Sequence, residues 1–129
     1  MDKQANERSA LAAVDAYLAG LNARDTAAIR AAFNFPHFRI GAKGNLVRYE
    51  RPEDYAFENF LAGVSRDGWH HTKWDRTEAV FTTEAKVHVA VDFTRYREDG
   101  SVIGRYFSLY VVTLQDGHWG IQLGSGNGT

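Results

Sequence analysis

The chain has 129 residues, of which 44% are hydrophobic and 24% are charged, as is typical of a single globular domain over residues 1–129. Its 15 Lys and Arg nearly balance 16 Asp and Glu without a run of like charges, which argues against nucleic acid or an anionic membrane as a partner. The absence of cysteine excludes disulfides, thiolate catalysis and cysteine metal sites.

Residues 1–25 carry charges throughout and lack the apolar core of a secretory signal, and no stretch approaches the roughly 18 apolar residues of a membrane span. Together with the lack of cysteine, this favours a cytoplasmic protein. The glycines of GAKGN and GSGNG lack the strand-to-helix context of phosphate-binding loops, so no nucleotide cofactor is expected.

The chain opens with a predicted amphipathic helix over about residues 5–23. Its apolar stripe consists of Leu11, Val14, Leu18 and Leu21. Tyr17 lies beside this stripe. The helix therefore needs a sheet or another helix to cover one side.

A second, shorter helix is predicted after an N-cap at Asp25 or Thr26. Ile29 and Phe33 are four residues apart and face one side of it. Pro36 ends the helical pattern.

Two short strands joined by a turn are predicted over residues 37–49, because the residues there alternate around GAKGN. The run Arg51-Pro52-Glu53-Asp54 predicts the start of a third helix, with proline at its first position and acids near the positive end of its dipole. The apolar face of this helix consists of Phe57, Phe60, Leu61 and Val64. Gly68 ends it.

From His70 onward four antiparallel strands are predicted in a meander, with turns at Thr83-Glu84, Asp99-Gly100 and Asp116-Gly117. The Asp-Gly turns fix the register and so sort the side chains onto two faces. The first face is nearly all apolar and is expected to cover the helices: Val89, Val91, Phe93, Tyr106, Ser108, Tyr110, Val112, Leu114, Trp119, Ile121 and Leu123. The second face is apolar at its centre, which favours cover by a partner subunit: His88, Ala90, Asp92, Thr94, Phe107, Leu109, Val111, Thr113 and Gln122.

This order of elements predicts an α+β domain with its helices on the concave side of the sheet. The order, with AYLAGLNARDTAAIRAAF near the start and GHWGIQ near the end, resembles the nuclear transport factor 2-like superfamily over nearly the whole chain, and most of all its SnoaL-like branch. The resemblance implies a cone-shaped domain in which three N-terminal helices pack on a curved antiparallel sheet with a mixed edge and enclose a deep, mostly apolar pocket. It also implies a homodimer formed through the outer sheet face. Relatives include ketosteroid isomerases, scytalone dehydratase, dehydrochlorinases and polyketide cyclases, so the fold does not imply one activity.

The stretch GWHHTKWD, residues 68–75, offers His70 and His71 for proton transfer, because an imidazole titrates near neutral pH. Dehydratase-type relatives pair a histidine at the start of the first long meander strand with an aspartate near the end of the first helix. By this resemblance His71 or His70 is the base, but Asn22 stands at the acid's position and cannot stabilise an imidazolium as a carboxylate does. The alternative is structural, with one histidine solvated and the other packed on Trp69 or Trp74. Adjacent strand residues face opposite sides, so no metal site is expected here.

Further side chains are expected to bind the substrate or line the pocket: Tyr17, Asn22, His37, Trp74, Tyr106, Ser108 and Tyr110. His37 lies where a strand enters the pocket rim, and the last three line up on the inner face. The leading hypothesis is a cofactor-free isomerase, dehydratase or cyclase acting on an apolar or aromatic carbonyl compound. The rival hypothesis, favoured by Asn22, is a non-catalytic module for ligand binding or dimerisation.

Overall fold

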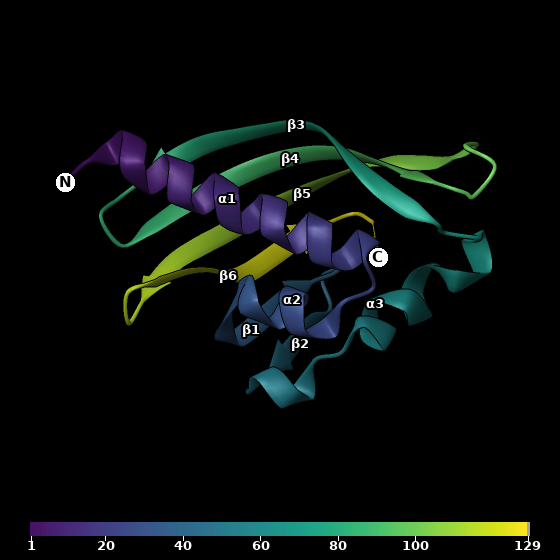
Figure 1. Cartoon of the computed structure of the whole chain (residues 1–129), viewed down its shortest axis with the longest axis horizontal. Helices are drawn as coiled ribbons and strands as arrows, with labels where there is room; N and C mark the ends of the chain where they lie inside the picture. The colour runs from purple at the N-terminus through teal and green to yellow at the C-terminus, as the bar shows by residue number, and fades with distance from the viewer. Residues whose placement is uncertain (129) are drawn as a thin grey trace.

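The computed structural model describes residues 1–128 as an α+β domain (Figure 1). Its elements in chain order are α1 (Lys3–Asn22), α2 (Thr26–Ala31), β1 (Phe33–Ile40), β2 (Leu46–Tyr49), α3 (Phe57–Val64), β3 (His71–Thr82), β4 (Lys86–Tyr96), β5 (Val102–Gln115) and β6 (His118–Gly126). The six strands form one sheet in the order β2-β1-β6-β5-β4-β3. Only the β1–β6 pair is parallel, so the expected mixed sheet and the four-stranded meander are confirmed. Within the described residues no helix is long and apolar enough to cross a membrane.

The helices lie on one side of this sheet. Figure 1 shows α1 crossing in front of the strands, with α2 and α3 near β1 and β2. Asp25 caps α2 as expected, its Oδ1 accepting a hydrogen bond from Ala28 N at 3.1 Å. The prediction that Phe33 belongs to this helix is wrong, because α2 ends at Ala31 and Phe33 pairs with Ile121 of β6. Strand pairing overrides local helical spacing at this point.

The third helix begins later than predicted. Pro52 to Asp54 form only a short 3-10 turn, after which the chain is extended at Tyr55 and α3 starts at Phe57. Tyr55 is thereby buried in the core. Gly68 ends the helical region with a φ of 76°, a left-handed conformation that glycine adopts without steric cost.

The predicted register of the central strands is confirmed. Phe93 lies opposite Tyr106, and Gln115 opposite His118 across the two-residue turn Asp116-Gly117. Both turn residues have positive φ, at 52° and 79°, as a hairpin turn of this length requires.

Two residues assigned to the core face, Leu123 and Leu114, are not buried in the core. A bulge between Val111 and Val112 shifts β6 by one residue, so Leu123 lies opposite Val111 on the outer face and Gly124 takes the position opposite Tyr110. Leu114 remains 40% exposed, near the end of its strand. The sheet therefore extends past the cover that the helices provide.

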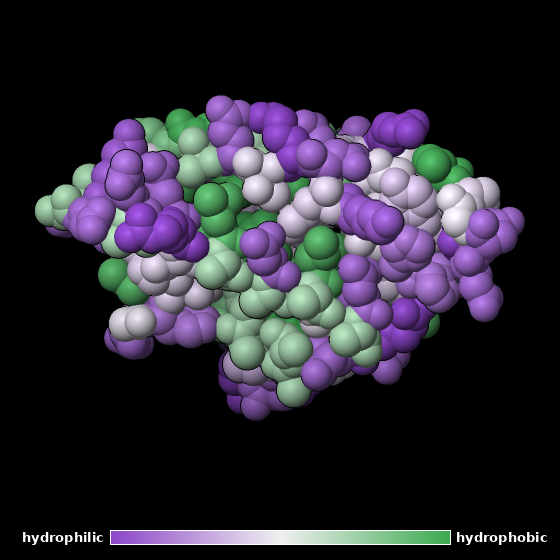
Figure 2. All heavy atoms as spheres, turned by 45° about the horizontal axis from the view of Figure 1, so that its top comes forward, coloured by the Kyte–Doolittle hydropathy of each residue, from purple (hydrophilic) through white to green (hydrophobic). Residues whose placement is uncertain are grey.

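Figure 2 shows mildly hydrophobic side chains over the middle of the helical side, between more hydrophilic ends. Exposed alanines of α1 and α2 contribute to such a surface: Ala12, Ala16, Ala19, Ala27 and Ala31. Alanine favours helix formation without adding a large apolar group to the surface. On the outer sheet face Phe81 and Phe107 are 51% and 41% exposed. Dimerisation through that face stays a prediction.

Candidate functional site

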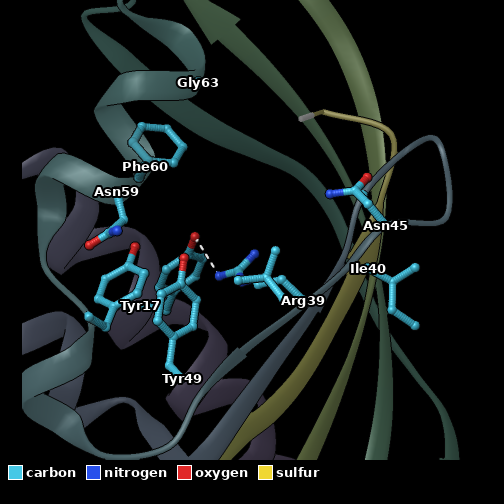
Figure 3. Close-up of a pocket in the computed structure, with 11 residues that line it drawn as sticks. Tyr17, Arg39, Ile40, Asn45, Tyr49, Asn59, Phe60 and Gly63 are labelled. Carbon is cyan, nitrogen blue, oxygen red and sulfur yellow. Dashed lines mark hydrogen bonds between the residues drawn. The ribbon is translucent and has the colours of Figure 1, made fainter.

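A cavity of about 210 Å³ opens between α1, α3 and the β1–β2 edge of the sheet. Its walls include Tyr17, Arg39, Tyr49, Tyr55, Asn59 and Phe60. Figure 3 shows the Arg39 side chain reaching from its strand toward the tyrosine rings. The cavity thus combines an aromatic lining with one cationic group.

Hydrogen bonds and aromatic rings hold the Arg39 guanidinium in place. Its Nη2 donates to the Tyr17 hydroxyl at 2.9 Å, and its Nε donates to His37 Nε2 at 3.1 Å (Figure 3 marks the first). The guanidinium carbon lies 5.2 Å from the centre of the Tyr17 ring and 5.6 Å from that of Phe33, within the range of cation–π attraction. No carboxylate of residues 1–128 forms an ion pair with Arg39.

His37 positions this arginine from within the core. It is completely buried and stacks on Phe33 with ring centres 3.7 Å apart. Its Nδ1 lies 2.8 Å from the Ile121 carbonyl oxygen, which only accepts, so Nδ1 carries the proton and Nε2 accepts from Arg39. Burial, and then the Arg39 charge, lower the pKa of His37 from 6.5 to about 3. The predicted direct contact of His37 with a substrate is therefore replaced by an indirect role, because its ring nitrogens already have partners.

Gly124 leaves room for the guanidinium. A Cβ there would lie 3.2 Å from Arg39 Nη1 and 3.1 Å from Tyr110 Cε1, closer than ordinary packing allows. The bulge in β6 places this glycine opposite Tyr110, where Leu123 was expected. A leucine side chain at that point would occupy the place of the arginine.

Three tyrosines around the site, Tyr49, Tyr55 and Tyr110, act as hydroxyl donors rather than as bases at neutral pH. Burial raises the pKa of Tyr110 to about 12, and it also raises the pKa values of Tyr49 and Tyr55. Each therefore keeps its proton and can donate a hydrogen bond.

A second, smaller hollow of about 20 Å³ lies on the inner side of the first, and the two share Tyr17 and Phe60 as walls. Trp74, Arg95 and Tyr110 line it. The structure thus brings together three of the predicted pocket residues, Tyr17, Trp74 and Tyr110.

His70 and His71 line neither hollow. His70 is exposed, and His71 stacks on Tyr96 with ring centres 5.0 Å apart. Their Nδ1 atoms lie 3.0 Å apart, and burial, followed by the charges of His70 and Lys73, lowers the pKa of His71. Catalysis by this pair stays a prediction, and neither histidine lines the cavity.

Tyr106 and Ser108 lie on the inner face, as predicted, but line neither of these hollows. The Tyr106 ring lies 4.8 Å from the guanidinium carbon of Arg95. Ser108 is buried, and a Cβ on Gly126 would clash with its hydroxyl. Tyr106 thus contacts a residue that lines the smaller hollow.

Asn22 ties the end of α1 to the start of β3. Its Nδ2 donates to the Thr72 carbonyl at 2.8 Å, and its Oδ1 accepts from Thr72 N at 2.9 Å. Thr72 is only 2% exposed, so these backbone groups have little access to water. The Asn22 amide, which was expected to bind substrate, therefore uses its hydrogen bonds to hold α1 against β3.

Replacing Asn22 with alanine leaves both Thr72 backbone groups unpaired. We expect Asn22→Ala to lower the free energy of unfolding by about 1–3 kcal/mol, measured by urea denaturation. Gln4→Ala, which removes an exposed amide from the same helix, is the control and should change stability by less than about 0.5 kcal/mol. Equal effects of the two substitutions would contradict the assigned role.

Residues that the sequence analysis missed complete the site: Arg39, Tyr49, Tyr55, Asn59, Phe60 and Arg95. One signal was available, since strict alternation along β1 places Arg39 on the same side as His37. Among residues 1–128 no group of three His, Cys, Asp or Glu side chains gathers that would hold a metal ion.

Comparisons with known proteins agree with this architecture. A protein of unknown function with a cystatin-like fold from Nostoc punctiforme has a TM-score of 0.75 and 16% identity, over 94% of this chain and 89% of that one. A ketosteroid isomerase-like protein from Erwinia carotovora atroseptica has a TM-score of 0.70 and 18% identity, over 93% of each chain. An NTF-2 like protein of unknown function from Shewanella oneidensis MR-1 has a TM-score of 0.69 and 12% identity, over 94% of this chain and 98% of that one. At these identities the likeness shows the fold alone. The comparison with curated proteins finds no match. The model of the family described as NTF2-like protein (DUF6841) matches residues 6–124, and the chain therefore belongs to this NTF2-like family.

Proposed function

We propose that this protein binds a small molecule that joins an anionic group to an apolar body of about the size of an aromatic ring. One observation carries the proposal: the Arg39 guanidinium lines the cavity without an ion pair to any carboxylate of residues 1–128. Arg39 is only partly buried, but its charge has lost part of its contact with water and has no counter-ion, and a bound anion supplies the missing charge. The planar fork of arginine suits a carboxylate, sulfonate or phosphate.

The walls favour the same class of ligand. Tyr17, Tyr49, Tyr55 and Phe60 offer flat apolar faces, and the hydroxyls of Tyr49 and Tyr55 remain protonated donors. Hydrogen bonds to an anion are stronger in such a partly enclosed site than in water. A neutral apolar molecule would fill the space but leave the guanidinium uncompensated.

The proposal is one of binding rather than of acid–base catalysis. No His, Asp or Glu of the described chain lines either hollow. The nearest imidazole, His37, stays neutral and uses both ring nitrogens within the protein. These contacts favour the ligand-binding alternative that Asn22 first raised.

A matched pair of compounds tests the proposal. We expect 4-isopropylbenzoate to bind at least about tenfold more tightly than 4-isopropylbenzamide in isothermal titration calorimetry, because the two share a shape and only the first carries a charge. A panel of aromatic sulfonates and phosphates with neutral counterparts extends the comparison. Equal affinity within the pairs, or no binding of any anion in the panel, would contradict the proposal.

A further inference from the structure

A second guanidinium, that of Arg95, is buried and lines the inner hollow. The residue is 6% exposed and its Nη1 donates to the Gly128 carbonyl, but its buried Nε has no hydrogen-bond partner within residues 1–128. The guanidinium carbon lies 5.5 Å from the ring centre of Phe60 and 5.4 Å from that of Phe93. Its N–H is therefore a donor held among rings without an acceptor.

The indole of Trp74 presents a second donor of the same kind. Its Nε1 is buried and also lacks a partner among the described residues, while its ring packs 5.7 Å from Phe93 and 6.3 Å from Tyr110. Buried N–H groups without an acceptor are rare in folded proteins and call for an explanation. Here the two residues that carry them line one hollow of about 20 Å³, which has room for a single oxygen-sized group.

We infer that this hollow is an acceptor subsite in which Arg95 Nε–H and Trp74 Nε1–H donate to one oxygen of the bound molecule. The inference rests on the proposed function and narrows its ligand class. The outer cavity takes the anionic group at Arg39, Tyr17 and Phe60 enclose the body, and the inner hollow takes a second oxygen. The ligand is thus a carboxylic or similar acid with a carbonyl or other oxygen acceptor at its far end.

The electrostatics of the two hollows support such a two-ended ligand. Burial lowers the pKa of Arg95, the neighbouring Tyr17, Tyr106 and Tyr110 raise it by smaller amounts, and the charge of Arg39 makes the smallest contribution, a weak repulsion between the two cations. Oxygen lone pairs at both ends offset this repulsion, whereas an anion at Arg39 alone leaves Arg95 without compensation.

Two compounds of one shape separate the inner subsite from the outer one. Both 4-acetylbenzoate and 4-isopropylbenzoate carry the carboxylate, and only the first carries an oxygen acceptor at its far end. We expect the wild-type chain to bind 4-acetylbenzoate about tenfold more tightly. In Trp74→Phe, which keeps an aromatic wall and removes one donor, this preference should fall to about threefold or less with little change for 4-isopropylbenzoate. The indole ¹⁵N–¹H resonance of Trp74 should shift with the first compound and not with the second.

The possible results distinguish failure of the acceptor subsite from failure of the proposed function. Equal binding of the two benzoates by the wild type would overturn the acceptor subsite and leave the proposed function standing. Equal weakening of both compounds in Trp74→Phe would limit Trp74 to an apolar wall of the hollow and would also overturn it. Failure of both compounds and of all other anions to bind would remove the proposed function, and this inference with it.

Discussion

Arg39→Met should weaken binding of 4-isopropylbenzoate by about 1.5–3 kcal/mol, roughly 10- to 150-fold, and leave the weak binding of 4-isopropylbenzamide unchanged. Methionine keeps an unbranched apolar side chain about as long as the stem of arginine but removes the charge and the donors that face the cavity. The effect should be confined to charged ligands, because the aromatic walls remain. Isothermal titration calorimetry of both compounds against both proteins measures it.

Two further variants sharpen this experiment. Arg39→Lys keeps the charge but loses the planar fork and the bond from Nε to His37, so its affinity should fall between those of the wild type and Arg39→Met. Arg48→Met makes the same substitution on the neighbouring strand, where the side chain is exposed and pairs with Glu50, and should leave binding unaltered. Carboxylate affinity retained in Arg39→Met would show that the anion is held elsewhere.

The order of elements could be predicted from the sequence because it depends on local signals. Helical spacing located α1, Asp25 located the start of α2, and Asp116-Gly117 located the last hairpin. The pairing of β4 with β5 was also predicted correctly, although the length of the turn between them was not. The loop at Asp99-Gly100 is one residue longer than a two-residue turn, and a compensating bulge next to Arg95 restores the predicted pairing of Phe93 with Tyr106.

The site was less predictable, because its main residues depend on pairing between distant segments. Arg39 faces the cavity only because β1 pairs in parallel with β6, and because a bulge in β6 brings Gly124 rather than Leu123 beside it. Neither the bulge nor the parallel pairing has a local signature in the sequence. An arginine in a strand next to a turn is usually solvated, so the alternation that places it beside His37 was an insufficient signal.

The histidines illustrate the opposite problem. His70 and His71 attracted a catalytic interpretation through their chemistry and their position in the chain, yet they lie at the start of β3, outside the cavity. Asn22 gave the more useful signal, since an amide in place of an acid pointed to a non-catalytic module for ligand binding or dimerisation. Its bonds to Thr72 account for the amide at that position.

The buried His37 makes the stability of the fold depend on pH. Burial and the Arg39 charge lower its pKa to about 3 in the folded chain, from 6.5 for an unperturbed imidazole. Between these values the unfolded chain binds a proton that the folded chain does not, so the free energy of unfolding falls as the pH decreases below 6.5. The contribution is fully present above that pH, and its loss between pH 7 and pH 5 amounts to about 2 kcal/mol.

His37→Gln isolates this contribution, because glutamine can still donate to Ile121 and accept from Arg39 but does not titrate. We expect the variant to be less stable than the wild type at pH 7, since it loses the ring stacked on Phe33. That difference should shrink by about 2 kcal/mol when urea denaturation is repeated at pH 5. Comparing the two proteins cancels the pH dependence that the carboxylates and the other histidines contribute to stability. These histidines include His71 and His88, whose pKa values burial also lowers. Parallel stability curves would mean that His37 binds its proton equally well in the folded and unfolded chains, which its buried contacts with Ile121 and Arg39 oppose.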